Sequence, residues 1–179
     1  MIVIKILTVD DIVPDMLLAF RHHQIITKKW TNVDNKWKLT DASDLREWNT
    51  AKRIWITAYL RQQIRRGGSV VVAFDGDTLV GFGCVDGCLE GKSSKYANLT
   101  MLFVDDEWKR QGVGKRLFER ICICAQELKA EKLFISAIPS FETVAFYYAM
   151  GCVDAREIIS EYIDTDQDRY LEYSLETLI

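Results

Sequence analysis

The sequence predicts an α/β fold in which a mixed β-sheet of about seven strands is flanked by about four helices. Short runs of β-branched and aromatic residues recur between clusters of turn residues, a pattern typical of strands. Other stretches carry apolar residues every three or four positions, the spacing of an amphipathic helix. An Asp-Gly turn indicates an antiparallel hairpin, whereas a later helix, strand, helix order implies a parallel pair, so we expect a mixed sheet.

Length and composition limit the class of protein. The 179 residues, 49% of them hydrophobic, suit one domain over 1–179. A net charge of -3 is unlike the basic footprint of nucleic-acid-binding proteins, so no nucleic-acid partner is expected. No apolar stretch has the length of a membrane span and the start lacks a cleavable signal, which predicts a cytoplasmic protein without membrane contact. Five cysteines without a CxxC pair indicate reduced thiols and no metal site.

The first forty residues are the hardest to interpret. Residues 2–7 alternate as a strand, and polar residues at 8–11 offer caps for a helix that runs to about His23. His22 and His23, the only histidines, would stand at its end, where solvation or capping is commoner than catalysis. Residues 24–40 show no clear periodicity.

The middle of the chain predicts a long helix and then a hairpin. Asp41 or Ser43 can cap a helix over 44–66, which two glycines end. The runs 69–74 and 79–85 flank an Asp-Gly turn and should pair as antiparallel strands.

After the central motif described below, three more strands and a helix are expected. Residues 132–137 form a short apolar strand, and a helix runs from about Pro139 to Met150. Residues 153–163 and 170–175 should close the sheet as an antiparallel pair.

The chain is organised around residues 98–120. Strand-forming residues from Leu99 to Val104 are followed by an acidic turn and then by a helix beginning at Gly112. Its apolar stripe comprises Val113, Leu117, Ile121, Cys124 and Leu128.

The segment from Lys109 to Arg116 has the chemistry of a phosphate site. Two glycines let a ligand approach the backbone, and the amides of the first helical turn have no partner inside the helix. The four basic residues of the segment add positive charge to the positive end of the helix dipole. A dinucleotide loop would need a third glycine where Leu117 stands, and no Walker sequence is present, so both nucleotide interpretations fail.

This segment resembles the [QR]xxGx[GA] motif of the GNAT superfamily of acyl-CoA-dependent N-acyltransferases. Lys109 stands where that family prefers Gln or Arg. A second stretch, SFETVAFYYAMGC, is similar to the family's NxxAxxFYxxxGF: Phe146, Tyr147 and Gly151 are retained, whereas Ser140 replaces Asn. Thr143 and Cys152 also depart from the pattern. Together the two motifs predict the GNAT fold.

The resemblance implies a site for acetyl-CoA as cosubstrate, without a metal. The strand end should splay from its parallel neighbour and bind pantetheine and the thioester, and the helix start should hold the pyrophosphate. Tyr147 matches the family's tyrosine that protonates the departing CoA thiolate, and a phenol is protonated at neutral pH. The cofactor-binding residues implied are Leu102, Phe103, Val104, Lys109, Arg110, Gln111, Gly112, Val113, Gly114, Lys115, Arg116, Ser140 and Phe146.

The general base is not evident from the sequence. Family members that use a direct base carry it at positions matching Asn98 and Thr100, and neither side chain accepts a proton at neutral pH. A water relay through these two catalytic candidates is one expectation. A base elsewhere is the other, with Glu47, Asp86 or Glu90 as the candidates.

The expected activity is direct transfer of an acetyl group, in a ternary complex, from acetyl-CoA to a primary amine of a small molecule or peptide. The alternative is a noncatalytic acyl-CoA-binding or sensor module. Trp30 and Trp37 either wall the acceptor pocket or fasten a loop to the core. The acidic stretch after Cys152 is either a solvated face or a rim that attracts a cationic amine. A homodimer is one assembly that the resemblance implies.

Overall fold

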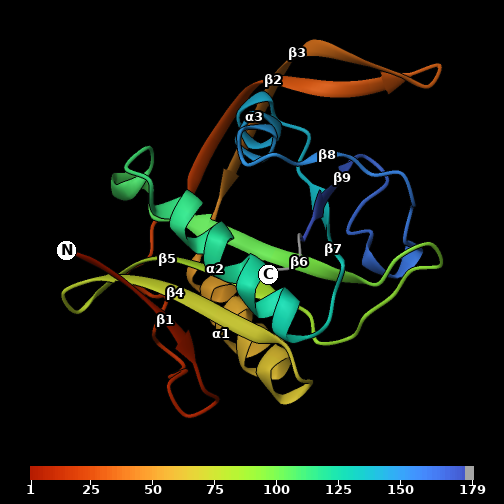
Figure 1. Cartoon of the computed structure of the whole chain (residues 1–179). Helices are drawn as coiled ribbons and strands as arrows, with labels where there is room; N and C mark the ends of the chain where they lie inside the picture. Colours follow the sequence, from red (N-terminus) through yellow and green to blue (C-terminus); the bar gives the residue numbers. More distant parts are fainter. Residues whose placement is uncertain (176–179) are drawn as a thin grey trace.

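The structure is a computed structural model, and it describes residues 1–175 (Figure 1). Its elements in chain order are β1 (Ile2–Leu7), β2 (His23–Val33), β3 (Lys36–Glu47), α1 (Thr50–Arg65), β4 (Ser69–Asp75), β5 (Thr78–Val85), β6 (Tyr96–Val104), η1 (Asp106–Trp108), α2 (Val113–Glu127), β7 (Lys132–Ala137), α3 (Phe141–Ala149), β8 (Val153–Asp154), η2 (Ser160–Tyr162) and β9 (Arg169–Ser174).

Seven of the strands form one mixed sheet in the order β1-β4-β5-β6-β7-β9-β8. Only β6 and β7 pair in parallel within it, as the helix, strand, helix order predicts. The other neighbours are antiparallel, among them β4 and β5, which turn at Gly76 with φ 57°. The predicted mixed α/β sheet is therefore confirmed, with three α-helices among the described residues rather than about four.

Helices cover the two faces of the sheet separately. On one face, α2 buries Leu117 and Ile121 in a core that includes Val71 and Leu133. On the other face, α1 buries Ile56 and Leu60 against β4 and β5 (Figure 1). Since side chains alternate along a strand, the central strands β4, β5 and β6 supply residues to both cores.

The helix expected to end near His23 does not form. Residues 9–19 contain turns instead, with i→i−3 bonds such as Met16 N to Val13 O at 3.1 Å. Pro14 explains the difference, because it has no N–H to donate and disfavours helical backbone at Val13. Asp11, expected as a cap, instead accepts hydrogen bonds from the backbone N and hydroxyl of Thr8, both at 2.7 Å.

Residues 24–47 form a long antiparallel hairpin rather than a loop and a helix start. Strands β2 and β3 reverse at Asp34 and Asn35, whose φ values of 51° and 59° are those of a type I′ turn. The hairpin is a separate two-stranded sheet that projects from the main sheet (Figure 1). Helix α1 consequently begins at Thr50 and not at 44, and its cap is Asn49, which accepts from Lys52 N at 2.8 Å.

The closing strands are shorter than expected. β8 has only two residues, and the chain then turns through η2, whose Tyr162 hydroxyl donates to the carbonyls of Cys88 and Tyr96 at 2.6 and 2.9 Å. β8 and β9 do pair antiparallel, as predicted. Glu176, the last acidic residue of this stretch, lies outside the described residues. Over 1–175, none of the helices has the length and apolar character needed to cross a membrane.

Candidate active site

The parallel strands β6 and β7 form a fork. They pair only at Tyr96, Ala97 and Asn98, and the pairing ends where Asn98 faces Phe134. β6 continues to Val104 alongside β5, while β7 turns toward α3 (Figure 1). On its β7 side, no described strand pairs with β6 beyond Asn98, so backbone donors and acceptors on this edge are available to a ligand. The predicted splay of Leu102 to Val104 is therefore observed.

The two faces of β6 differ within the fork. Leu99, Leu102 and Val104 pack toward α2. A bulge leaves Thr100 without a partner on β5, and its hydroxyl donates to the Cys84 carbonyl at 3.2 Å. Since bulges redirect side chains, this one sets the orientation of Thr100 at the opening of the fork.

The start of α2 has free backbone donors. Gly112 occupies the N-cap position with φ 81°, a left-handed conformation that favours glycine, and supplies no side-chain cap. The first turn contains no acidic residue. Glycine is favoured at position 114 for a different reason, because a Cβ there would lie 3.1 Å from the ring of Phe146. The amides of this turn therefore present positive partial charge without an internal carboxylate to neutralise it.

Three of the four basic side chains near this helix start have internal partners. Lys109 pairs with Asp106 and lies 3.4 Å from the His23 carbonyl. Arg116 donates to the Ile2 carbonyl at 3.0 Å, and Lys115 lies 3.8 Å from Glu119. Lys115 and Lys109 remain partly exposed, so their exposed pairs are weak enough to exchange for a phosphate.

A buried carboxylate holds the loop before α2. Asp105 is 3% exposed and accepts from the backbone N of Arg21 at 2.8 Å and from its guanidinium at 3.1 Å. It also accepts from Glu107 N at 3.1 Å, which caps η1. The acidic turn expected from sequence therefore joins the loop to the segment that precedes β2.

Helix α3 brings the second predicted motif against the first. Tyr147 is buried between the rings of Phe118, at 6.3 Å, and Phe146, at 5.2 Å. Burial, with a smaller effect from the Cys152 thiol, raises the pKa of Tyr147, so its phenol stays protonated. No described residue hydrogen-bonds to this hydroxyl, which leaves it free to donate to a ligand.

Ser140 has a structural role at the start of α3. Its completely buried hydroxyl accepts from Thr143 N and from Gln24 Nε2, both at 3.1 Å, and donates to Thr143 Oγ1 at 2.8 Å. A contact with the cofactor would require it to exchange one of these partners. Gln24, which sequence reasoning did not single out, joins β2 to α3 through this hydroxyl.

A family model described as an acetyltransferase (GNAT) domain matches residues 39–161. The chain belongs to this family. The match spans the hairpin's second strand, the fork, the start of α2 and α3, so it covers the features just described and confirms the resemblance noted in the sequence.

Solved acetyltransferases share the whole fold of this GNAT chain. A nourseothricin acetyltransferase superposes with a TM-score of 0.69 at 15% identity, over 98% of this chain and 99% of that one. A Bacillus anthracis str. Ames protein assigned as a streptothricin acetyltransferase, in complex with acetyl coenzyme A, gives 0.67 at 16%, over 97% and 99%. PaiA N-acetyltransferase from Thermoplasma acidophilum, with coenzyme A, gives 0.61 at 16%, over 97% and 99%. Among curated proteins, no sequence matches.

The expected base candidates of this GNAT protein lie in different places. Asn98 is mostly buried at the branch point of the fork, and its carbonyl accepts from Asp86 N at 2.9 Å. Glu90 pairs through its backbone with Tyr96, at the end of β6 away from the fork's opening. Glu47 lies at the end of β3, opposite His23. Of the three carboxylates, only Asp86 is therefore next to the branch point.

His22 is neither solvated nor a helix cap. Its ring is buried between Trp48, at 4.6 Å, and Phe103, at 5.0 Å, and its Nδ1 has no partner among the described residues. Burial, reinforced by the positive charge of Lys109, lowers its pKa to about 4. The ring therefore stays neutral at physiological pH and fills space beside the end of β6.

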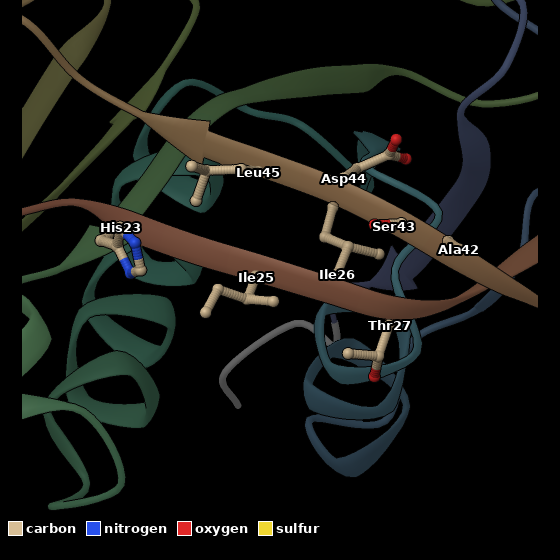
Figure 2. Close-up of a pocket in the computed structure, with 8 residues that line it drawn as sticks. All are labelled: His23, Ile25, Ile26, Thr27, Ala42, Ser43, Asp44 and Leu45. Carbon is tan, nitrogen blue, oxygen red and sulfur yellow. The ribbon is translucent and has the colours of Figure 1, made fainter.

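Trp30 and Trp37 contact an arginine. Both ring centres lie 4.8 Å from the guanidinium carbon of Arg169, whose Nε and Nη2 each donate to Asp154 at 2.9 Å. They fasten the hairpin to β9, and of the two expected roles the structure shows this one. The pocket at the base of the hairpin, about 300 Å³, lies elsewhere (Figure 2), and its lining residues are His23, Ile25, Ile26, Thr27, Ala42, Ser43, Asp44 and Leu45.

Proposed function

We propose that this GNAT protein transfers an acetyl group from acetyl-CoA to a primary amine of a small molecule, by direct attack in a ternary complex. The observation that carries the proposal is the fork between β6 and β7, whose free strand edge adjoins a helix start with free amides. The fork suits an extended amide-containing chain such as pantetheine, and the helix start suits a pyrophosphate. The cofactors named with two of the superposed structures support this choice of cosubstrate.

Acetyl-CoA would be held mainly by the backbone. The amides from Gln111 to Lys115 would receive the pyrophosphate, with Lys109, Arg110 and Arg116 adding positive charge around them. Leu102, Phe103 and Val104 would contact the pantetheine arm through their free edge. Phe146, packed against Gly114, would hold α3 and the helix start at the correct separation.

Tyr147 would supply the proton to the departing CoA sulfur. Its hydroxyl is protonated over the whole neutral range, since burial raises its pKa, and no described residue competes for its hydrogen bond. Asn98 and Thr100 would orient the acceptor or a water molecule at the opening of the fork. The names of superposed structures include antibiotic acetyltransferases, which favours a small amine over a protein as acceptor.

The test measures acetyl-CoA binding by calorimetry and CoA release with spermidine, lysine, an aminoglycoside and a lysine-containing peptide. Tyr147→Phe should bind acetyl-CoA like the wild type but lose about 10²-fold in kcat, the usual contribution of a positioned acid. Tyr148→Phe is the matched control, because the Tyr148 hydroxyl donates to Asp154 at 3.0 Å and has no role in transfer.

Each failure has its own meaning. Binding of acetyl-CoA without turnover of any amine would favour the alternative, a noncatalytic acyl-CoA-binding or sensor module. Failure to bind would show that the start of α2 is not a pyrophosphate site.

A further inference from the structure

The face of the fork that points away from α2 lies on the α1 side of the sheet, where Met101 and Phe103 of β6 pack in the same cluster as α1 and polar side chains lie beside them (Figure 1). Phe134 points to this face from β7, as its packing with Tyr96 and Tyr162 shows. Ser136 lies two residues after Phe134, on the arm of the fork that β7 forms beyond the branch point. Its side chain points to the same face as that of Phe134. Thr100 offers its hydroxyl from the other arm.

A loop before β9 is tied to this arm of β7. The Ser136 hydroxyl accepts from Asp164 N at 3.1 Å and donates to Asp168 Oδ2 at 2.7 Å. Asp168 Oδ1 accepts from Thr165 Oγ1 at 3.0 Å, which closes the loop on itself. The hydrogen bonds of Ser136 therefore fix Asp164 at the open end of the fork.

Ser136 and Thr100 each lie two residues beyond the last pair of the fork, Asn98 and Phe134, so the loop that Ser136 holds faces the arm of β6 that carries Thr100. Burial raises the pKa of Tyr59 on α1, hydrogen bonding with Thr100 opposes that rise, and electrostatic interactions with Cys84, Asp86 and Asp164 add to it. These effects agree with a position of Tyr59 on the face of the sheet that Thr100, Asp86 and Asp164 share. Asp164 consequently lies by the opening between the two arms.

We propose that Asp164 is the general base that deprotonates the acceptor amine. The inference rests on the proposed function and adds the group that the sequence did not supply. Of the nearby carboxylates, Asp168 is occupied by Ser136 and Thr165, and Asp86 Oδ1 accepts from Cys88 N at 2.9 Å. Asp164 alone among the three receives no hydrogen bond from a described residue on its carboxylate.

The surroundings of Asp164 suit this role. Partial desolvation, and the negative charge of Asp168, raise the pKa of Asp164 above its ordinary value, which makes it a stronger base than an unperturbed aspartate, and the residue is still exposed to an arriving acceptor. Asp86 and Tyr59 are among the other titratable groups on this face, and burial raises the pKa of Tyr59, so its phenol stays neutral. Lys132, on the same face of β7, is paired with Glu172 at 2.9 Å, so the three carboxylates near the opening favour an acceptor that arrives positively charged.

The proposed reaction removes two protons from the acceptor nitrogen. The acceptor ammonium gives one proton to the Asp164 carboxylate, and the lone pair of the resulting amine attacks the thioester carbonyl carbon. A C–N bond forms, the C–S bond breaks, and sulfur keeps the bonding pair. Tyr147 protonates the thiolate, and the second proton leaving nitrogen restores the phenol through water. The proton on Asp164 passes to solvent, so one ammonium and one acetyl-CoA give one amide, one CoA thiol and one free proton.

The test compares Asp164→Asn with Asp166→Asn. Both remove one negative charge from the same exposed loop, but the Asp166 carboxylate accepts from the Gln167 side-chain amide, at 3.3 Å, and its backbone is not bonded to Ser136. With spermidine at neutral pH, Asp164→Asn should lose about 10²-fold in kcat/KM, whereas Asp166→Asn should stay near the wild type. Acetyl-CoA affinity should be unchanged in both variants.

Hydroxylamine separates a base from a structural role. It is neutral at the assay pH and needs no deprotonation before attack, so Asp164→Asn should retain most of the wild-type rate with it after the uncatalysed reaction is subtracted. Asp164→Glu should recover part of the spermidine activity. Equal losses with both nucleophiles would overturn the assignment of a base.

Two further outcomes keep this proposal apart from the proposed function. If Asp44→Asn rather than Asp164→Asn abolishes spermidine turnover, the acceptor lies in the hairpin pocket and Asp164 is not the base. If the wild type turns over no amine, including hydroxylamine, the proposed function fails and this inference falls with it.

Discussion

The guanidinium carbon of Arg169 lies 4.8 Å from the ring centre of Trp30, so the far part of the β2–β3 hairpin is fastened to strand β9 of the main sheet. Trp37 repeats the contact from the other strand of the hairpin. The backbone N of Trp30 also donates to the Pro139 carbonyl, at 2.7 Å. Gln24 Nε2 adds a hydrogen bond to Ser140 at 3.1 Å, closer to the base of the hairpin, so the Arg169 contacts are those that hold its far part.

Trp30→Ala should loosen the hairpin without unfolding the sheet. The loss of one cation–π contact costs about 0.5–2 kcal/mol, and the backbone amides of the hairpin should then exchange faster with deuterium. Leu39→Ala is the control, because Leu39 is the cross-strand partner of Trp30 but is exposed. Unchanged exchange in Trp30→Ala would show that other contacts hold the hairpin.

Gly112→Ala should weaken acetyl-CoA binding through the backbone. A Cβ at this position would meet no atom within 4 Å, so the cost arises from φ 81° alone and is about 1–2 kcal/mol. Relief of this strain would rotate the first amides of α2 away from a pyrophosphate. Calorimetry with CoA, and with pantetheine, which has no pyrophosphate, would check this, since only the affinity for CoA should fall.

His22 should make the protein less stable as pH decreases. Its folded-state pKa of about 4 lies below the ordinary 6.5, so below pH 6.5 the unfolded chain binds the proton more readily. The free energy of unfolding should fall by up to about 1.4 kcal/mol per pH unit from pH 6.5 toward 4, and this contribution should level off below.

Urea unfolding of His22→Phe across that range is the measurement. The variant places a third apolar ring beside Trp48 and Phe103 and should lack this part of the pH dependence. His23→Phe removes the adjacent, exposed imidazole and should keep the wild-type slope. A parallel pH dependence in His22→Phe would contradict the burial argument.

Cys88 should be the thiol that reacts with alkylating reagents at neutral pH. It is exposed, whereas burial raises the pKa of Cys84, Cys122 and Cys152 to about 12, and the thiolate is the reactive species. Mass spectrometry after brief iodoacetamide treatment should show one modification in the wild type and none in Cys88→Ser. Rapid modification of a second cysteine would mean that the core opens on that timescale.

The parts of the fold that could be predicted from sequence are those with strong local patterns. The strand at 99–104 and the helix after Gly112 form as expected because hydrophobic period and glycine placement specify them over a few residues. The strand at 132–137 was predicted with the bounds that the structure has.

The hairpin escaped prediction for a physical reason. It projects from the sheet with exposed residues on both sides, so its sequence need not alternate apolar and polar residues. The Asp34-Asn35 pair was the available signal, since both residues tolerate positive φ. Pro14 was likewise sufficient reason to doubt a helix through that position.

The sequence by itself determined the helix start proposed to hold the pyrophosphate and the motif around Tyr147, because glycines, amides and charges that act together there are neighbours in the chain. Only the tertiary structure decided which groups share the opposite face of the fork. Asp164 and Ser136 are 28 residues apart, and Tyr59 comes from a third element. Their proximity depends on strand order, on the point where β6 and β7 part and on how the last loop packs, and no local pattern of residues encodes these long-range choices.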